Sequence, residues 1–577
     1  MSGSWVAALS LFLFFIGYRY YSKYLAEYIF RLDPDYMTPA HRFNDGVDYV
    51  PANKLVLWGH HFTSIAGAAP IVGPAIAVYW GWVPAMLWVV FGTIFAAGVH
   101  DFSTLAISIR NKGQSIGTLA HKLVGQRAKI LFLFIILILV LMVNAVFAWV
   151  ISNLFISFPA SVLSIFIQIP LAVWLGYHVY RRSGNMLVPS LVILFLMYFA
   201  AIIASYVPAL QIDFVRYFGG EEATYMFGLS GIEMSFFLWI VILMTYVYIA
   251  STLPVWTLLQ PRDFINSHQL LLGLLILYLG LFVTNPEITA PTTNPGADDV
   301  SWFPLLFITI ACGAISGFHG LVSSGTTAKQ LNKETDARFI GYLGAVGEGT
   351  LALITIVAVV TYFNTTGEFL EHYHSFDEAG AAGLNIFVEG AAQLATGLLI
   401  PLEVAQTIIA VIVISFAATT LDTSVRLMRY IINELGVEYR IGPLTKLHFS
   451  TFLAVGASAA LVLIPEGPRG LGSGGYLLWP LFGTSNQLLA AISLLIVTIW
   501  LKRKGRSIIY TLVPMIFVLF MTLWAMTEQV FFDWSGWGDT DGNMLLFVFG
   551  SIILGFALWI ILEAIHLMRR FDKDKDY

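Results

Sequence analysis

The chain has 577 residues, of which 58% are apolar and 11% carry a charge. A soluble protein of this length must wet its whole exterior, so this composition excludes a soluble globular protein. It predicts an all-α polytopic membrane protein, because lipid satisfies no backbone amides and the alternating pattern of a membrane β-barrel is absent. The net charge of −5 includes no basic block that would suggest a nucleic-acid partner. The single cysteine, Cys312, excludes a disulfide framework and a cysteine-based zinc site.

Apolar segments that cross about 30 Å of hydrocarbon need roughly 20 residues. The first such segment resembles a signal peptide but lacks a basic start and a small-x-small cleavage site, so we expect it to be retained. We expect about 15 transmembrane helices in one transmembrane domain, residues 1–577, because no connection is long enough for a soluble domain. The fifteen segments are residues 5–21, 57–80, 83–107, 128–150, 159–180, 187–208, 233–258, 268–284, 303–322, 339–363, 398–424, 447–465, 477–501, 507–527 and 545–568.

The distribution of basic residues predicts the orientation of these spans. With the N-terminus outside, the cytoplasmic connections hold 28 of the 30 Lys and Arg residues, and Arg216 and Arg469 alone fall outside. Acidic stretches such as Asp298-Asp299 and residues 533–541 lie on the outer side, as does the longest connection, 364–397. One miscounted span would invert every later connection, so the asymmetry predicts an outside N-terminus and a cytoplasmic C-terminus. The chain contains neither GxxxxGK[ST] nor HExxH, which argues against an ATP-driven pump.

The span at 57–80 combines titratable side chains with helix breakers. His60 and His61 precede the stretch GAAPIVGP, where Pro70 and Pro74 each remove a helix hydrogen bond. A discontinuous helix here would free backbone groups to bind a substrate or ion, whereas the alternative is a Pro-kinked helix packed through small residues. The residues expected to contact substrate in this span are Gly67, Ala68, Ala69, Pro70 and Gly73.

The span at 233–258 carries Ser251, Thr252 and Pro254 near its middle and runs in the opposite direction. Two interrupted spans of opposite direction, five apart, are typical of inverted five-helix repeats, in which the broken first helices hold the substrate. We therefore expect Ser251 and Thr252 to complete the substrate site. The first repeat would cover residues 57–232 and the second 233–446. Residues 1–56 would form the first helix and a cytoplasmic re-entry segment, and 447–577 additional C-terminal helices.

Polar side chains inside other spans are candidates for binding a coupling ion, because burying them in lipid is costly. His100-Asp101 is either a proton relay or an anchor near the interface, and Glu348 is either a silent protonated acid or a coupling site. The hydroxyl groups after His319 either line a cation site or cap a helix end. The expected coupling residues are His60, His61, His100, Asp101, His319, Ser323, Ser324, Thr327 and Glu348. A further alternative is a metal ion bound by His60, His61 and His319.

Two further polar groups are expected to be structural. Asp422 and Arg426 are four residues apart, which favours an ion pair on one helix face. Asn486 and Gln487 are expected to form hydrogen bonds to neighbouring helices.

Several of these stretches resemble the carbon starvation protein A family of prokaryotic transporters. They are DGVDYVP (45–51), GHHF, GAAPIVGP, His100-Asp101-Phe102, HGLVSSGTTAKQL (319–331), Leu421-Asp422-Thr423 and LWPLFGTSNQ (478–487). The resemblance implies a proton-linked importer of small organic nutrients, pyruvate or peptides, in a bacterial or archaeal inner membrane. It also implies a core related to the inverted-repeat transporters of the LeuT/APC type. Many members are longer than this chain.

These observations predict a secondary active transporter and not an enzyme. It would lie in the lipid bilayer and import a small carboxylate or short peptide with protons. The alternatives are a sodium-coupled symporter, a passive facilitator, or a membrane nutrient receptor that acts through a partner protein. Apart from the coupling proton or Na⁺ and the alternative of a histidine-bound metal ion, no cofactor is expected. The sequence predicts no particular oligomeric state.

Overall fold

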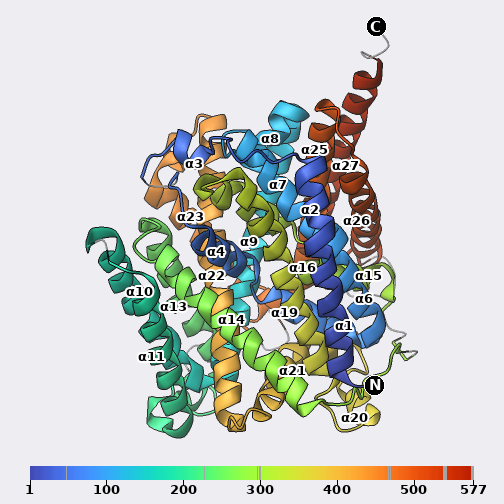
Figure 1. Ribbon diagram of the computed structural model, residues 1–577. Helices are drawn as coiled ribbons and strands as arrows, with labels where there is room; N and C mark the ends of the chain where they lie inside the picture. Colours follow the sequence, from blue (N-terminus) through green and yellow to red (C-terminus); the bar gives the residue numbers. More distant parts are fainter. Residues whose placement is uncertain are drawn as a thin grey trace.

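The computed structural model describes the chain except for residues 47–48, 183, 226–227, 295, 298–299, 466, 468–469, 537–541 and 574–577. Every regular element of the described residues is a helix, which confirms the all-α class. The two termini lie at opposite ends of the helix bundle (Figure 1). Arg469, Asp298 and Asp299, which entered the orientation argument, lie outside the described residues, as do Val47 and Asp48 of the DGVDYVP stretch.

The helices agree with the apolar segments of the sequence. Those of the first half are α1 (Gly3–Ile16), continued as helix to Ile29, α4 (Lys54–Ile65), α5 (Ala69–Ala77), α6 (Trp82–Gly92), α7 (Gly98–Arg110), α8 (Ile116–Leu123), α9 (Gln126–Ser157), α10 (Val162–Arg182), α11 (Leu187–Tyr206), α13 (Gly231–Thr252) and α14 (Leu259–Thr284). Those of the second half are α15 (Trp302–Thr309), α16 (Ala311–Ala314), α17 (Gly317–Val322), α19 (Leu343–Val360), α20 (Thr366–His372), α21 (Phe376–Thr396), α22 (Leu402–Glu438), α23 (Leu447–Leu463), α25 (Trp479–Arg503), α26 (Ile509–Glu528) and α27 (Met544–Lys573). Shorter helices are α2 (Ser22–Tyr24), α3 (Pro39–Arg42), α12 (Phe214–Tyr217), α18 (Ala328–Gln330) and α24 (Gly474–Leu477).

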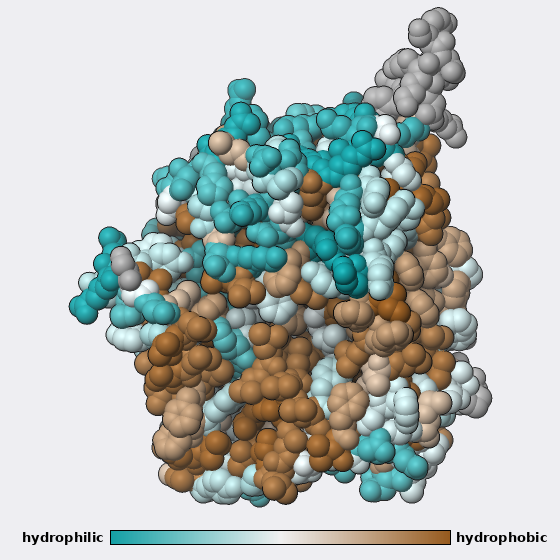
Figure 2. All heavy atoms as spheres, in the orientation of Figure 1, coloured by the Kyte–Doolittle hydropathy of each residue, from teal (hydrophilic) through white to brown (hydrophobic). Residues whose placement is uncertain are grey.

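The helices identify a polytopic membrane protein. Within the described residues, twelve helices are long and apolar enough to cross a bilayer, and a bent pair, α4 with α5, raises the number to thirteen. Apolar side chains cover a broad belt of the surface, and polar side chains gather mainly at the end where the C-terminus lies (Figure 2). The connection 364–397 contains two helices, α20 and α21, of which α21 has 21 residues.

Many of the basic residues assigned to the cytoplasmic side meet at this same end. Arg503, after α25, donates to the Leu123 carbonyl at the end of α8 (2.8 Å). Arg110, at the end of α7, pairs with Glu334 (2.6 Å). We call this region, where residues 108–129, 323–338, 425–446 and 502–506 come together, the basic end. It is the cytoplasmic end under the predicted orientation.

The expected interruption of the span at 57–80 is confirmed. Helix α4 ends at Ile65, α5 begins at Ala69, and the two are bent by 47°. Ala66 leaves the helix with ψ at 59°, and Pro70 stands in the first turn of α5, where its missing N–H costs no helix hydrogen bond. Pro74 lies inside α5, so the break falls at residues 66–68, ahead of both prolines.

The second interruption lies elsewhere than the sequence predicted. Helix α13 continues unbroken to Thr252, and residues 253–258 form the turn that leads into α14. Pro254 therefore follows a helix end, a common position for proline. The interrupted span is the one at 303–322: α15, α16 and α17 are separate helices, with Ser316 extended between the last two. Gly313 adopts a φ of +104° within this break, a conformation that glycine accepts readily.

The two interrupted spans lie side by side in opposite directions. At one end, the Ala52 N–H before α4 donates to the Gln330 carbonyl after α17 (2.9 Å). At the other end, the Trp80 indole after α5 donates to the Val300 carbonyl before α15 (2.8 Å). Between them, a Cβ added at Gly73 would lie 2.2 Å from the Thr309 carbonyl oxygen. The backbones of α5 and α15 therefore touch through Gly73.

We expect Gly73→Ala to lower the free energy of unfolding by about 1–3 kcal/mol, because the added methyl group must push the α15 backbone away. The apparent Tm of the full chain in detergent measures this change. Gly456→Ala in α23 is the matched control, since a Cβ there meets no atom within 4 Å. Equal Tm values for both variants would contradict the close contact of the interrupted helices.

Candidate functional site

The break between α4 and α5 is enclosed by two long helices. A Cβ at Gly67 would lie 2.7 Å from the Phe147 ring of α9 and 2.7 Å from Thr420 Oγ1 of α22. Thr420 Oγ1 also donates a long hydrogen bond to the Ser64 carbonyl (3.5 Å). A side chain at Gly67 would therefore separate the break from its neighbours. The other residues expected to contact substrate in this span, Ala68, Ala69, Pro70 and Gly73, are buried around it.

Asn486 of α25 satisfies backbone and side-chain groups at the second break. Its amide oxygen accepts the Phe318 N–H (2.9 Å), and its amide nitrogen donates to Ser316 Oγ (3.0 Å) and to Cys312 Sγ (3.0 Å). The expected interhelical hydrogen bonds of Asn486 are thus present. Gln487 is also buried, but neither amide atom has a partner among the described residues.

Four titratable side chains contact one another in series, and one of them, His319, lies three residues after Ser316 of the second break. His100 Nδ1 lies 2.8 Å from Asp101 Oδ1, and His319 Nδ1 lies 2.9 Å from Asp101 Oδ2. His319 Nε2 lies 3.3 Å from Glu348 Oε1. All four residues are at most 1% exposed. We call His100, Asp101, His319 and Glu348 the histidine–carboxylate row; it joins α7, α17 and α19, and the sequence had marked each member separately.

The row is connected to the second break through α19. Ala352 lies one helical turn beyond Glu348, and its Cβ would lie 2.8 Å from a Cβ at Gly313. Thr93 donates to the Gly313 carbonyl (3.0 Å) and lies against Gly349. A change in the charge or position of Glu348 therefore acts next to the backbone of Gly313.

The two histidines of α4 contact different helices. His60 Nδ1 lies 2.8 Å from Asp263 Oδ2 of α14, and His61 Nδ1 lies 3.0 Å from Thr327 Oγ1. A Cβ at Gly344 of α19 would lie 2.8 Å from the His61 ring, so His61 is close to the helix that carries Glu348. No group of three or more His, Cys, Asp or Glu side chains suited to a metal ion occurs in the described part of the chain. His60, His61 and His319 each have a different carboxylate or hydroxyl partner.

The two serines expected to help bind a coupling ion are buried beside this region. Ser324 Oγ donates to the Gly320 carbonyl (2.6 Å) and accepts the Ile116 N–H (3.1 Å), as a structural hydroxyl does. Ser323 Oγ has no hydrogen-bond partner among the described residues.

Comparison with known proteins places this geometry in a family. The family model of the carbon starvation protein CstA matches residues 2–372 and 362–525. The chain belongs to the CstA family. The pyruvate/proton symporter BtsT of Escherichia coli (strain K12) is 32% identical to it, covering 92% of this chain and 82% of that protein. The peptide transporter CstA of the same strain is 31% identical, covering 91% and 81%, and the peptide transporter CstA of Bacillus subtilis (strain 168) is 30% identical, covering 100% and 98%.

Membership of the CstA family confirms the resemblance seen in the sequence. These relatives are transporters and not enzymes, so the chain is a membrane transporter rather than a catalyst. Three members of the histidine–carboxylate row, His100, Asp101 and His319, lie within the stretches that carried the resemblance.

A second buried network was missed by the sequence analysis. Asp422 does not pair with Arg426, as expected, but with Arg262 of α14, and the Tyr246 hydroxyl donates to the same carboxylate (2.9 Å). Arg262 Nη2 lies 3.5 Å from Asp263 Oδ1, which extends the network to His60. Residues 260–267 had been assigned to a cytoplasmic connection, but α14 begins at Leu259 and buries both charges. The adjacent opposite charges of Arg262 and Asp263, next to a predicted span, were the sequence feature that could have indicated a buried ion pair.

Arg426 holds the end of α13 instead. Its Nη2 donates to the carbonyls of Ala250 (2.8 Å) and Leu253 (2.9 Å), and Arg429 donates to the Ser251 carbonyl (2.8 Å). Thr252 Oγ1 donates to the carbonyl of Ile249 within its own helix. No contact found among the described residues joins Ser251 or Thr252 to the break at 66–68, so the structure does not bring these two substrate candidates to the others.

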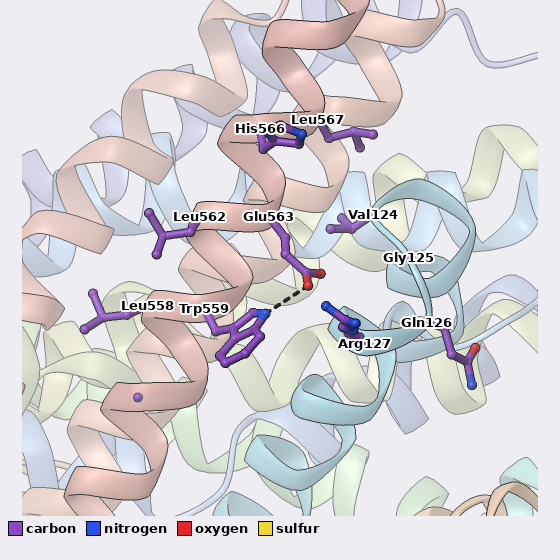
Figure 3. Close-up of a pocket in the computed structure, with 11 residues that line it drawn as sticks. Val124, Gly125, Gln126, Arg127, Leu558, Trp559, Leu562, Glu563, His566 and Leu567 are labelled. Atoms are coloured by element: carbon purple, nitrogen blue, oxygen red, sulfur yellow. Dashed lines mark hydrogen bonds between the residues drawn. The ribbon is translucent and has the colours of Figure 1, made fainter.

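A cavity of about 790 Å³ lies at the periphery of the bundle. It is a groove between α27 and the start of α9, where Trp559 donates to Glu563 (2.9 Å) and Arg127 faces them (Figure 3). Trp559 and Leu562 are 52% and 67% exposed on the apolar outer surface. None of the residues expected at the transport site lines this groove, so its size does not mark the substrate path.

We expect Asp101→Asn to lower the free energy of unfolding by about 3 kcal/mol, because it removes the charge that two buried imidazoles share. The apparent Tm in detergent measures the loss. Glu378→Gln is the control, since its pair with His374 is long (4.0 Å) and more than half exposed. If the two variants unfolded at the same temperature, the row would not be an electrostatic unit.

Proposed function

We propose that this protein is a proton-coupled secondary active transporter of the prokaryotic inner membrane that imports a small organic nutrient bearing a carboxylate, pyruvate or a short peptide, during carbon limitation. The observation that carries this proposal is the histidine–carboxylate row. The names of the relatives, a pyruvate/proton symporter and peptide transporters, support the substrate class.

The proposed architecture has fifteen spans, with the N-terminus outside and the C-terminus in the cytoplasm. Each of the fifteen apolar segments contains described helix, and the basic end supports the orientation. The antiparallel, touching pair of interrupted spans supports an inverted-repeat core, but the pair is seven spans apart and not the five of the expected LeuT-type repeat. In that core the first helix of the second repeat would be α15–α17 rather than α13, which moves the proposed start of the second repeat from residue 233 to about residue 302.

The substrate would bind at the paired breaks. Residues 66–68 leave the helix where Gly67, Phe147 and Thr420 meet, and the second break at Gly313 lies 3.6 Å from Pro70 when measured from an added Cβ. Helix starts and ends exposed by such breaks carry partial charges that suit a carboxylate and its counter-ion. Closed packing around Gly67 indicates that helices must part before a substrate enters this site.

Proton coupling follows from the composition of the row. Imidazole is the side chain that ordinarily changes charge near neutral pH, and His319 stands between two carboxylates at 2.9 and 3.3 Å. A proton gained or lost by this trio changes the net charge of a buried cluster held by three helices. Because the conformations that open to either side solvate the cluster differently, its protonation would shift the balance between them.

Uptake of labelled pyruvate and of labelled dialanine into proteoliposomes tests the function. We expect accumulation above the outside concentration when an inward proton gradient is imposed, and none when the gradient is collapsed. Accumulation that follows a sodium gradient instead would replace the proton by Na⁺. Equilibration without accumulation under either gradient would identify a passive facilitator and overturn the proposal.

We expect Glu348→Gln to abolish gradient-driven accumulation while retaining exchange of labelled for unlabelled substrate, because the amide keeps the shape of the side chain but cannot take up a proton. Counterflow and net uptake are measured in the same proteoliposomes. Glu371→Gln, an exposed carboxylate in the outer connection, should retain both activities. Normal accumulation by Glu348→Gln would remove this residue from the coupling step.

A further inference from the structure

Two adjoining cavities lie at the basic end, away from the breaks. The smaller, about 30 Å³, is bordered by His60, Thr423 and Arg426. The larger, about 240 Å³, is bordered by residues that include Tyr49 and Gln114. Gly325, Lys329, Leu427 and Tyr430 line both cavities. We call the two together the vestibule.

The smaller cavity is lined by buried polar atoms that lack partners. His60 Nε2, Thr423 Oγ1 and Arg426 Nε each have no hydrogen-bond partner among the described residues. These side chains are 4%, 1% and 5% exposed. Buried polar groups are ordinarily satisfied, because an unsatisfied one costs about 1–3 kcal/mol. Three of them around one cavity indicate a ligand group with several polar atoms.

The charge of the lining specifies an anion. Arg426 uses Nη2 on two backbone carbonyls, and no carboxylate of the described residues lies within ion-pair distance of it. The Lys329 ammonium lies over the rings of Tyr49 and Tyr430, 5.4 and 5.7 Å from their centres, likewise with no carboxylate partner in the described part of the chain. The smaller cavity has no Asp or Glu in its lining. A buried guanidinium without a counter-ion is unfavourable, and an entering anion would supply one.

We infer that the vestibule is a second binding site for the transported molecule, in which its carboxylate occupies the smaller cavity against Arg426, Thr423 and Lys329. The inference rests on the proposed function for the identity of the ligand. The smaller cavity has room for a small polar group and no more. The larger cavity, at 240 Å³, holds the remainder of a molecule with few non-hydrogen atoms, such as pyruvate or a dipeptide.

The position of the vestibule gives this site a role. His60 lines it through Nε2 and contacts Asp263 through Nδ1, so it forms the wall between the vestibule and the buried Arg262–Asp422 network. Under the proposed orientation the vestibule lies on the cytoplasmic side of the breaks. It therefore binds the substrate after the central site and before release.

The test measures equilibrium binding to the purified full chain in nanodiscs. The probes are pyruvate and dialanine, each compared with its neutral amide, pyruvamide and alanyl-alaninamide. For Lys329→Gln we expect the Kd of both carboxylates to rise roughly tenfold, the effect of one charge-assisted hydrogen bond. Thr423→Val, which keeps the side-chain volume, should raise it roughly threefold. The amides should bind the wild type weakly and be insensitive to Lys329→Gln.

Lys333→Gln is the matched control, because Lys333 lies four residues away, is exposed and lines neither cavity. Unchanged thermal unfolding of each variant without ligand excludes misfolding as the cause. Equal Kd values for wild type and Lys329→Gln, equal binding of acid and amide, or no binding of either acid would each overturn the inference. The proposed function is tested separately. If it is wrong, the wild type will show no gradient-driven accumulation in proteoliposomes.

Discussion

Inside a bilayer-spanning protein, each backbone group released from a helix must find a partner within the protein, and this requirement shapes the centre of the molecule. The interruption at Gly313 and Ser316 is possible because Asn486 accepts the Phe318 N–H and Thr93 donates to the Gly313 carbonyl. These partners come from α25 and from the π-helical turn between α6 and α7. The neighbouring helices thus supply the hydrogen-bond partners that the interrupted helix lacks.

Charges obey the same requirement. Six helices contribute to the two buried networks, the histidine–carboxylate row and the cluster of Arg262, Asp422 and Asp263 with Tyr246. In each network at least one ion pair joins two helices: His319 of α17 contacts Asp101 of α7, and Arg262 of α14 contacts Asp422 of α22. Pairs of this kind are costly to separate in a medium of low dielectric constant, so a rearrangement that exchanges partners is favoured over one that leaves a charge alone. Proton uptake relaxes this restriction, which makes the row suited to controlling helix movement.

Local chemistry explains which parts of this arrangement could be predicted from sequence. Apolar segments and helix bounds agree because each span must match the bilayer by its own composition, and the break at 66–68 was predictable because Gly67 and Pro70 act on their own backbone. The break at Gly313 was missed, since residues 305–322 contain no proline and the stabilising partner Asn486 lies 174 residues from Cys312. The members of the row were identified one by one, because burying each in a membrane is costly. Their contacts could not be predicted, because Asp101 and His319 are 218 residues apart in the sequence. Arg262 was assigned to a connection for the same reason, because its burial depends on Asp422, 160 residues away.

The hydrogen bonds from α22 to the end of α13 have a consequence for how these helices move. Arg426 and Arg429 reach the carbonyls of Ala250, Ser251 and Leu253, and these carbonyls flank the turn that leads into α14. Asp422, one turn earlier on α22, is tied to Arg262 on the far side of that same turn. The turn between α13 and α14 is therefore bonded to α22 on both of its sides. These three helices would move as one rigid unit. A displacement of α22 at its basic end would then shift α14 and, through the contact between Asp263 and His60, the first interrupted span.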